Sequence, residues 1–197
     1  MSENQEQHRK WIMFKKANRT KFVDFTGNPW GNNKWEDYEQ GTNYCKAKCV
    51  TKDGTWYAHA VIDGTSTGSC AAILDDNATT FATGRNSIKN ADLVSVTIIP
   101  PEHIKIHMSS FYFNASCAQG YWIRNVYYFD DSTQSFKAYK QGYTSYIGGT
   151  SDNMSIITEA PIVYTSKIKI STYNMNNKSK TVVARTLKPN AGTLKYY

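Results

Sequence analysis

The chain has 197 residues; 40% are hydrophobic, 20% charged and 14% aromatic, and 23 basic against 16 acidic residues give a net charge of +7. The aromatic content excludes a disordered chain, the charged fraction is too low for a coiled coil, and no apolar stretch approaches the ~18 residues of a membrane span. The length suits one large domain, or one domain with an appendage. Because the basic residues are dispersed, we interpret them as a solvated surface and expect no nucleic-acid partner.

Residues 1–42 predict an irregular N-terminal arm. Its polar start lacks the charged-then-apolar pattern of a secretory signal, so we expect the chain to be made and folded in the cytoplasm, as a virion component also is. An apolar cluster at 11–14 and a stretch dense in turn formers at 26–33 follow. The aromatic residues of this arm are expected to pack on the main domain or on a partner subunit.

Residues 43–197 predict an antiparallel β domain, because short β-branched and aromatic runs alternate with turn clusters. In the run 103–108, Ile104, Ile106 and Met108 lie on one face of a strand and the polar residues on the other. Such runs at a spacing of about ten residues are typical of a sandwich or barrel. The expected strands are 44–50, 55–62, 93–99, 103–108, 121–129, 136–140, 162–164, 167–173 and 181–187. Helical signal is nearly absent; residues 69–74 predict a single turn.

The four cysteines do not form a recognisable metal motif. Cys45 and Cys49 have a metal-like spacing, but no second pair of ligands follows at a matching separation. We interpret Cys45, Cys49, Cys70 and Cys117 as free, mostly buried thiols.

Motifs that carry catalysis are also missing. The sequence has no Gly-x-Ser-x-Gly turn, no glycine-rich phosphate loop and no carboxylate pair that stands out as an acid and a base. His103 and His107 share a strand face but lie ~13 Å apart in an extended chain, too far to bind one metal ion. We therefore do not predict an enzyme.

Aromatic residues are the surplus that suggests a function. Trp30, Trp35, Tyr143 and Tyr146 lie in or beside turns and strand ends, where a flat ring can stack on a sugar. We take these four residues as candidate glycan contacts. Core packing is the competing interpretation, and a protein interface, where Trp and Tyr are enriched, is a third.

Residues 71–81, Ala-Ala-Ile-Leu-Asp-Asp-Asn-Ala-Thr-Thr-Phe, resemble the Ala-x-Asp-x-(Asn/Asp)-x-x-Thr-x-Trp stretch of the galactose-binding-like, or discoidin (F5/8 type C), family, with Phe81 in place of Trp. Residues 123–139 and 160–170 resemble later strand units of that family, and the resemblance covers roughly 55–190. It implies an eight-stranded jelly roll with ligands at the loops of one end. It also implies a structural calcium ion near Asp75, Asp76 and Thr80, and binding of glycans, lipids or proteins without catalysis.

These observations favour a non-catalytic structural and binding protein. Our first hypothesis is a virion component, such as a phage tail or head fibre, whose jelly roll contacts other subunits of the assembly or host-surface carbohydrate. The alternative is a stand-alone carbohydrate-binding module. A glycoside-active enzyme ranks third.

Overall fold

The computed structural model describes residues 3–17, 20–62, 65–77, 79–80, 82–86, 92–117, 121–146, 152–155, 162–174 and 180–197. In these ranges the chain forms two helices, α1 (Glu3–Ala17) and α2 (Cys70–Leu74), and thirteen strands. The strands are β1 (Lys21–Thr26), β2 (Trp35–Gln40), β3 (Tyr44–Thr51), β4 (Gly54–Ile62), β5 (Thr65–Gly68), β6 (Ala82–Asn86), β7 (Asp92–Ile99), β8 (Ile104–Cys117), β9 (Tyr121–Asp130), β10 (Ser135–Tyr146), β11 (Asp152–Ser155), β12 (Ile168–Asn174) and β13 (Lys180–Tyr196).

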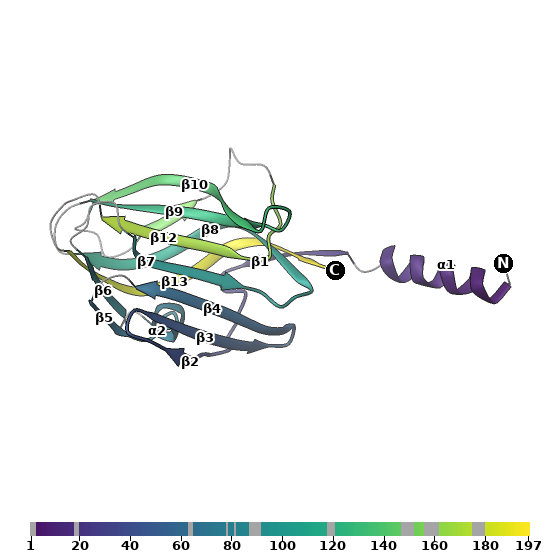
Figure 1. Ribbon diagram of the computed structural model, residues 1–197, viewed down its shortest axis with the longest axis horizontal. Helices are drawn as coiled ribbons and strands as arrows, with labels where there is room; N and C mark the ends of the chain where they lie inside the picture. Colours follow the sequence, from purple (N-terminus) through teal and green to yellow (C-terminus); the bar gives the residue numbers. More distant parts are fainter. Residues whose placement is uncertain are drawn as a thin grey trace.

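The described strands form two antiparallel sheets stacked face to face (Figure 1). One has seven strands in the order β10-β9-β12-β7-β4-β3-β2. The other has six, with β11-β8-β13-β6-β5 in a row and β1 paired to β13. β13 organises the six-stranded sheet: β8 runs along one side of it, while β6 and β1 share the other. The predicted antiparallel sandwich is confirmed.

The core lies between the two sheets, where the inward residues of alternating strands meet. On β8, Ile104, Ile106 and Met108 are buried, as the alternation predicted. A register shift between β8 and β13 near Ala191 then changes which positions of β8 face inward, so Phe111 and Phe113 continue the buried row. An extra residue in one strand produces such a change of face.

Local sequence explains the tightest connections. At the β3–β4 hairpin, the Thr51 hydroxyl accepts a hydrogen bond from the Asp53 amide, and Gly54 takes φ +123°, which a side chain would strain. The turn predicted at 69–74 is α2, where the Ser69 hydroxyl accepts from the Ala72 amide as an N-cap.

The N-terminal region differs from the predicted irregular arm. β1 pairs with β13 and β2 pairs with β3, so the sandwich begins at Lys21 rather than near residue 43. Residues 3–17 form α1, which projects away from the sheets (Figure 1). Residues 162–164, predicted as a strand, are described without regular structure. No helix in the described part of the chain combines the length and the apolar character needed to cross a membrane.

Candidate functional site

The loop from β1 to β2 is folded back on itself by its asparagines. The Asn28 side-chain oxygen accepts a hydrogen bond from the Trp30 amide (2.9 Å), and the Asn33 side-chain nitrogen donates to the Trp30 carbonyl (2.7 Å). Gly31 lies between them at φ +59°. Asn side chains that bond to nearby backbone stabilise turns of this kind, so the loop has a defined shape.

This loop and the α2 region line the two sides of a hollow of about 870 Å³. Its lining residues are Asn28, Gly31, Asn32, Asn33, Lys34, Trp35, Ala71, Leu74, Asp75, Asp76 and Asn77. Asn32 and Lys34 are exposed, and neither forms a hydrogen bond or ion pair with another residue in the described ranges. The hollow therefore offers amides, carboxylates and an ammonium group beside an aromatic ring.

The tryptophans of this region belong to the core. Trp30 is fully buried and Trp35 is 6% exposed. Their rings meet edge to face at 4.9 Å between centroids, and Trp30 meets Trp56 in the same way at 6.3 Å. The prediction that Trp30 stacks on a glycan is corrected, because its ring has no accessible face. Trp35 lines the hollow, but its side chain is almost covered, so too little of the ring is exposed for a sugar to stack on it.

The indole nitrogens of this cluster have an unusual environment. Those of Trp30 and Trp35 are buried and have no hydrogen-bond partner among the described atoms. A perpendicular ring pair is the arrangement in which an indole N–H can point at a neighbouring ring face, which is a weak hydrogen bond.

The other two predicted glycan contacts lie in β10. The backbone of Tyr143 pairs with Arg124 and that of Tyr146 with Tyr121, both in β9. Their side chains lie outside the described part of the structure, so their expected contact with a glycan stays a prediction.

The loop after α2 gathers oxygen atoms around the Thr80 hydroxyl. This hydroxyl lies 2.6 Å from Asp75 Oδ2, 3.0 Å from the Asn77 carbonyl and 3.3 Å from the Ala72 carbonyl. The other carboxylate oxygen of Asp75 accepts from the Asn77 amide (2.9 Å). Calcium takes oxygen donors from carboxylates, hydroxyls and backbone carbonyls, so the donors gathered here fit that ion.

Asp76 does not join this oxygen cluster. It adopts φ +55°, and its carboxylate forms an ion pair with Lys188 of β13 at 2.8 Å. The structure thus brings together two of the three predicted calcium ligands, Asp75 and Thr80, and directs the third toward a cation.

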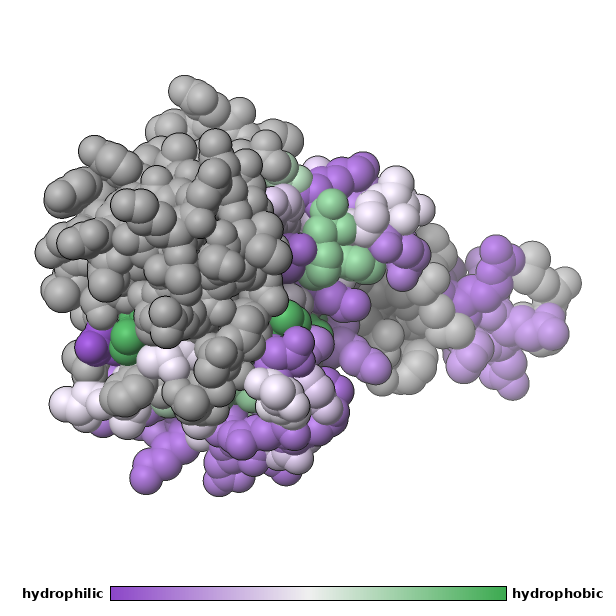
Figure 2. Space-filling view, turned by 60° about the vertical axis from the view of Figure 1, so that its left-hand side comes forward, coloured by the Kyte–Doolittle hydropathy of each residue, from purple (hydrophilic) through white to green (hydrophobic). Residues whose placement is uncertain are grey.

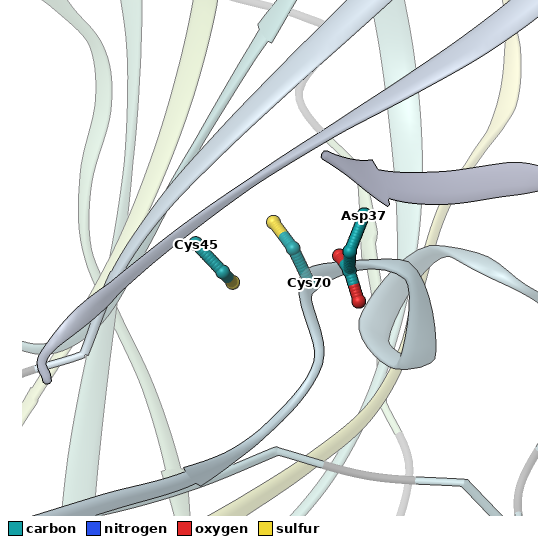
Figure 3. Close-up of side chains that lie close together, drawn as sticks. All are labelled: Asp37, Cys45 and Cys70. Atoms are coloured by element: carbon teal, nitrogen blue, oxygen red, sulfur yellow. The ribbon is translucent and has the colours of Figure 1, made fainter. Parts of the chain in front are cut away.

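The cysteines show a juxtaposition that spacing did not predict. Cys45, Cys49 and Cys70 are free and buried, as expected; the side chain of Cys117 is outside the described residues. Cys45 meets Cys70 and Asp37, whose ligand atoms lie within 4.8 Å of one another (Figure 3). Cys49 is not part of this group.

The acidic turn after β9, Asp130 and Asp131, forms hydrogen bonds and ion pairs at the surface. Lys137 and Ser132 hydrogen bond to Asp130 and hold its pKa well below the usual range. Hydrogen bonds from Lys105 and Ser166 lower the pKa of Asp131 as well. The lowered pKa values mean that both carboxyl groups are stabilised as anions. A general acid at neutral pH needs a raised pKa instead.

The face drawn in Figure 2 shows hydrophobic residues as small separate patches among hydrophilic ones. Large contiguous apolar patches mark protein docking surfaces. The coloured part of this face therefore has the character of a solvated surface.

Comparisons with known proteins find likeness in structure. No family model matches the sequence, and no curated protein matches it. The module CpGH89CBM32-6 of Clostridium perfringens is similar over 71% of this chain and 94% of its own, at 9% identity and a TM-score of 0.48.

Two further solved structures are similar at the same level. CBM32-1 from a family 31 glycoside hydrolase of Clostridium perfringens is similar over 83% of this chain and 99% of its own, at 11% identity and a TM-score of 0.45. Chitosan-binding module 1 of a chitosanase/glucanase from Paenibacillus sp. IK-5 is similar over 69% and 96%, at 9% identity and a TM-score of 0.42. At these identities and TM-scores the likeness says nothing of what this chain binds, which depends on its own residues.

Proposed function

We propose that this protein is a non-catalytic carbohydrate-binding module whose ligand site is the hollow between the β1–β2 loop and α2. The observation that carries the proposal is the composition of its lining, in which Asn28, Asn32, Asn33 and Asn77 contribute amides. A sugar hydroxyl both donates and accepts hydrogen bonds, and an amide side chain does the same. The volume of about 870 Å³ also falls within the range of small-molecule sites.

The residues with uncommitted polar groups decide where a sugar binds. Asn28 and Asn33 already bond to the Trp30 backbone, and Asn77 holds Thr79. Asn32 and Lys34 carry no such bonds within the described chain. We assign these two side chains as the principal hydrogen-bonding contacts.

The state of the two acids in the hollow supports binding rather than hydrolysis. Asp75 accepts hydrogen bonds from Thr80 and from the Asn77 amide, and Asp76 is paired with Lys188. Glycoside hydrolysis needs one protonated and one ionised carboxyl group on either side of the scissile bond. Both acids here are already engaged, Asp75 by hydrogen-bond donors and Asp76 by a lysine. Neither the described residues nor the comparisons add support for the virion role expected from the sequence.

A glycan array followed by titration calorimetry on the full chain tests this function. We expect Asn32→Ala and Lys34→Ala each to weaken the selected glycan about 5–10-fold, the worth of one hydrogen bond. Lys169→Ala is the matched control, because Lys169 lies on β12, four strands from β2 in the sheet. A blank array at high protein concentration, or a double variant that binds like the parent, would refute the proposal.

Calcium would stabilise one wall of this hollow. We propose that Asp75, Thr80 and the carbonyls of Ala72 and Asn77 hold the ion, which when bound would fix the loop after α2. Thermal melts in calcium and in excess chelator are expected to differ by several degrees, and Asp75→Asn to abolish the difference. Asp76→Asn should retain it, since Asp76 faces Lys188. Identical melts of the parent protein in both buffers would show that the Thr80 hydroxyl alone closes the loop.

A further inference from the structure

Three side chains that can ligate metal meet beside the start of α2. Asp37 comes from β2, Cys45 from β3 and Cys70 from the first position of α2. Their ligand atoms lie within 4.8 Å of one another, and Cys70 stands between the other two in Figure 3. Cys45 is 2% exposed and Cys70 has no exposed surface. The cluster is therefore an interior feature that joins three elements.

Strand alternation in β2 places the acid of this cluster on the inner face, because Asp37 lies two positions after the buried Trp35. Asp37 lies opposite Ala47, which is fully buried, whereas Glu36 and Glu39 lie opposite lysines of β3. The register shift between Asp37 and Glu39 then turns Glu39 to the outer face, where it pairs with Lys46. An acidic residue directed inward is uncommon unless it is paired.

The Asp37 carboxylate is held in place without a cation. It accepts hydrogen bonds from the Ala71 amide (2.9 Å), from the Ser69 hydroxyl and from the Gln40 side chain (3.2 Å). Within the ranges that the structure describes, it has no ion pair. Its negative charge thus remains beside two sulfur atoms.

The thiol of Cys70 responds to these surroundings. A hydrogen bond with Cys45, burial and the nearby Asp37 carboxylate raise the pKa of Cys70 far above its usual value. A divalent cation attracts a carboxylate and stabilises thiolates, so the three side chains gathered here suit one.

We propose that Asp37, Cys45 and Cys70 form a binding site for a thiophilic divalent cation, with zinc(II) as the best fit. Two thiolates and a carboxylate are ligands that zinc takes, and the sulfurs exclude the hard cations magnesium and calcium. Ser69 and the Ala71 amide would orient the carboxylate, as outer-shell donors do in metal sites. Binding of Zn²⁺ forms two Zn–S bonds and one Zn–O bond, releases the two thiol protons to water, and leaves one tetrahedral position open.

A disulfide between Cys45 and Cys70 is the competing outcome for the same sulfurs. It would leave the Asp37 charge beside an apolar S–S bond, whereas a cation neutralises that charge; the geometry therefore favours the metal. The bound ion would tie α2 to β2 and β3. This site does not depend on the proposed carbohydrate function, since neither sulfur lines the hollow.

Cobalt(II) titration of the full-length, reduced and metal-free protein tests the site directly. We expect one equivalent to produce a thiolate-to-cobalt charge-transfer band that zinc(II) removes. Cys45→Ser and Cys70→Ser should lose the band, and Asp37→Asn should weaken binding at least tenfold. Cys49→Ser is the matched control, because Cys49 is equally buried on the same strand but outside the cluster. A parent protein without the band, or a Cys49→Ser variant that loses it equally, would overturn the proposal.

Thermal melts separate metal binding from a folding defect. Zinc at 100 times its dissociation constant should raise the Tm of the parent and of Cys49→Ser by about 5–10 °C. Cys45→Ser and Cys70→Ser should show no zinc-dependent shift, whatever their metal-free Tm. Intact-mass measurement distinguishes a disulfide from a metal site. If the protein loses two hydrogens on mild oxidation with a small-molecule disulfide, and does not bind zinc when it is reduced, the cluster is a disulfide site and the zinc proposal is wrong.

Discussion

The asparagines on either side of Trp30 decide where its ring lies. Asn28 and Asn33 bond to the Trp30 backbone, turning the loop so that the indole enters the core beside Trp56. A tryptophan in a turn-rich stretch therefore packs inward, and the surface left outside is that of the asparagines themselves. The same bonds that bury the aromatic ring create the polar wall of the hollow.

His107 gives the molecule a pH dependence. Its Nε2 lies 2.7 Å from the Tyr139 hydroxyl, its ring packs on Tyr139 and Tyr164, and burial lowers its pKa. A depressed folded-state pKa means that the unfolded chain binds the proton first. We therefore expect the contribution of His107 to the free energy of unfolding to be constant above pH 7 and to fall as pH drops through ~6.5, the unfolded value.

The substitution His107→Asn would remove part of this pH dependence of the free energy of unfolding. Denaturant titrations of His107→Asn between pH 8 and pH 5.5 should show a smaller fall than those of the parent protein, with pH 8 as the internal reference. Part of the fall should remain, because burial also lowers the pKa of His59. An unchanged profile in the variant would show that His107 does not titrate on unfolding.

Sequence proximity determined which site residues could be predicted. Asp75 and Thr80 are five positions apart in one loop, so a local pattern was enough to pair them. Asp37 and Cys70 meet only because β2 pairs with β3 and α2 docks beside these two strands. Neither event leaves a signal in residue spacing, and the exposure of Trp30 and Trp35 depended on loop geometry in the same way.

At the scale of elements, the strands with clean alternation were predictable and the others were not. β8 shows the pattern clearly through Ile104 and Ile106, and its register follows from which face is buried. β2, with the sequence Trp-Glu-Asp-Tyr-Glu-Gln, is polar at most positions because it is an edge strand with one neighbour. β1 is identified by its pairing with β13 rather than by its own composition.

Gly192 lies where three strands of one sheet are paired side by side. It lies in β13 opposite Phe25 of β1 and Met108 of β8. A Cβ at this position would clash with the His107 carbonyl oxygen and lie 2.7 Å from the Phe25 ring. Because backbone cannot move aside as a side chain can, we expect Gly192→Ala to cost about 1–3 kcal/mol of unfolding free energy in urea titrations.

Thr193→Ala is the matched change on the same strand. Its hydroxyl donates to Asp24 at an exposed site, so its loss should stay within ~0.5 kcal/mol. Equal stability of the two variants would mean that β1 and β8 do not lie as close to Gly192 of β13 as the structure shows.

For the molecule as a whole, the sandwich and α1 are held by different forces. The sheets share one buried core, whereas the side chains of residues 3–10 are all exposed. α1 is supported locally by Glu3 and Glu6 in its first turn and by a Glu6–Lys10 ion pair of 3.5 Å. Such local contributions are small, so we expect residues 3–10 to add little to the stability of the sheets.

Removing α1 is therefore expected to leave the sandwich intact. A chain that starts at residue 18 should keep its Tm within about 2 °C and its glycan affinity unchanged, because the hollow is lined from Asn28 onward. A chain that starts at residue 27 also loses β1, the strand that covers one side of β13 and contributes Phe25 to the core, and should melt several degrees lower. Calorimetry on both truncations, with sedimentation to follow their mass, distinguishes the two elements; a large loss of Tm in the shorter deletion would show that α1 packs on the sheets in solution.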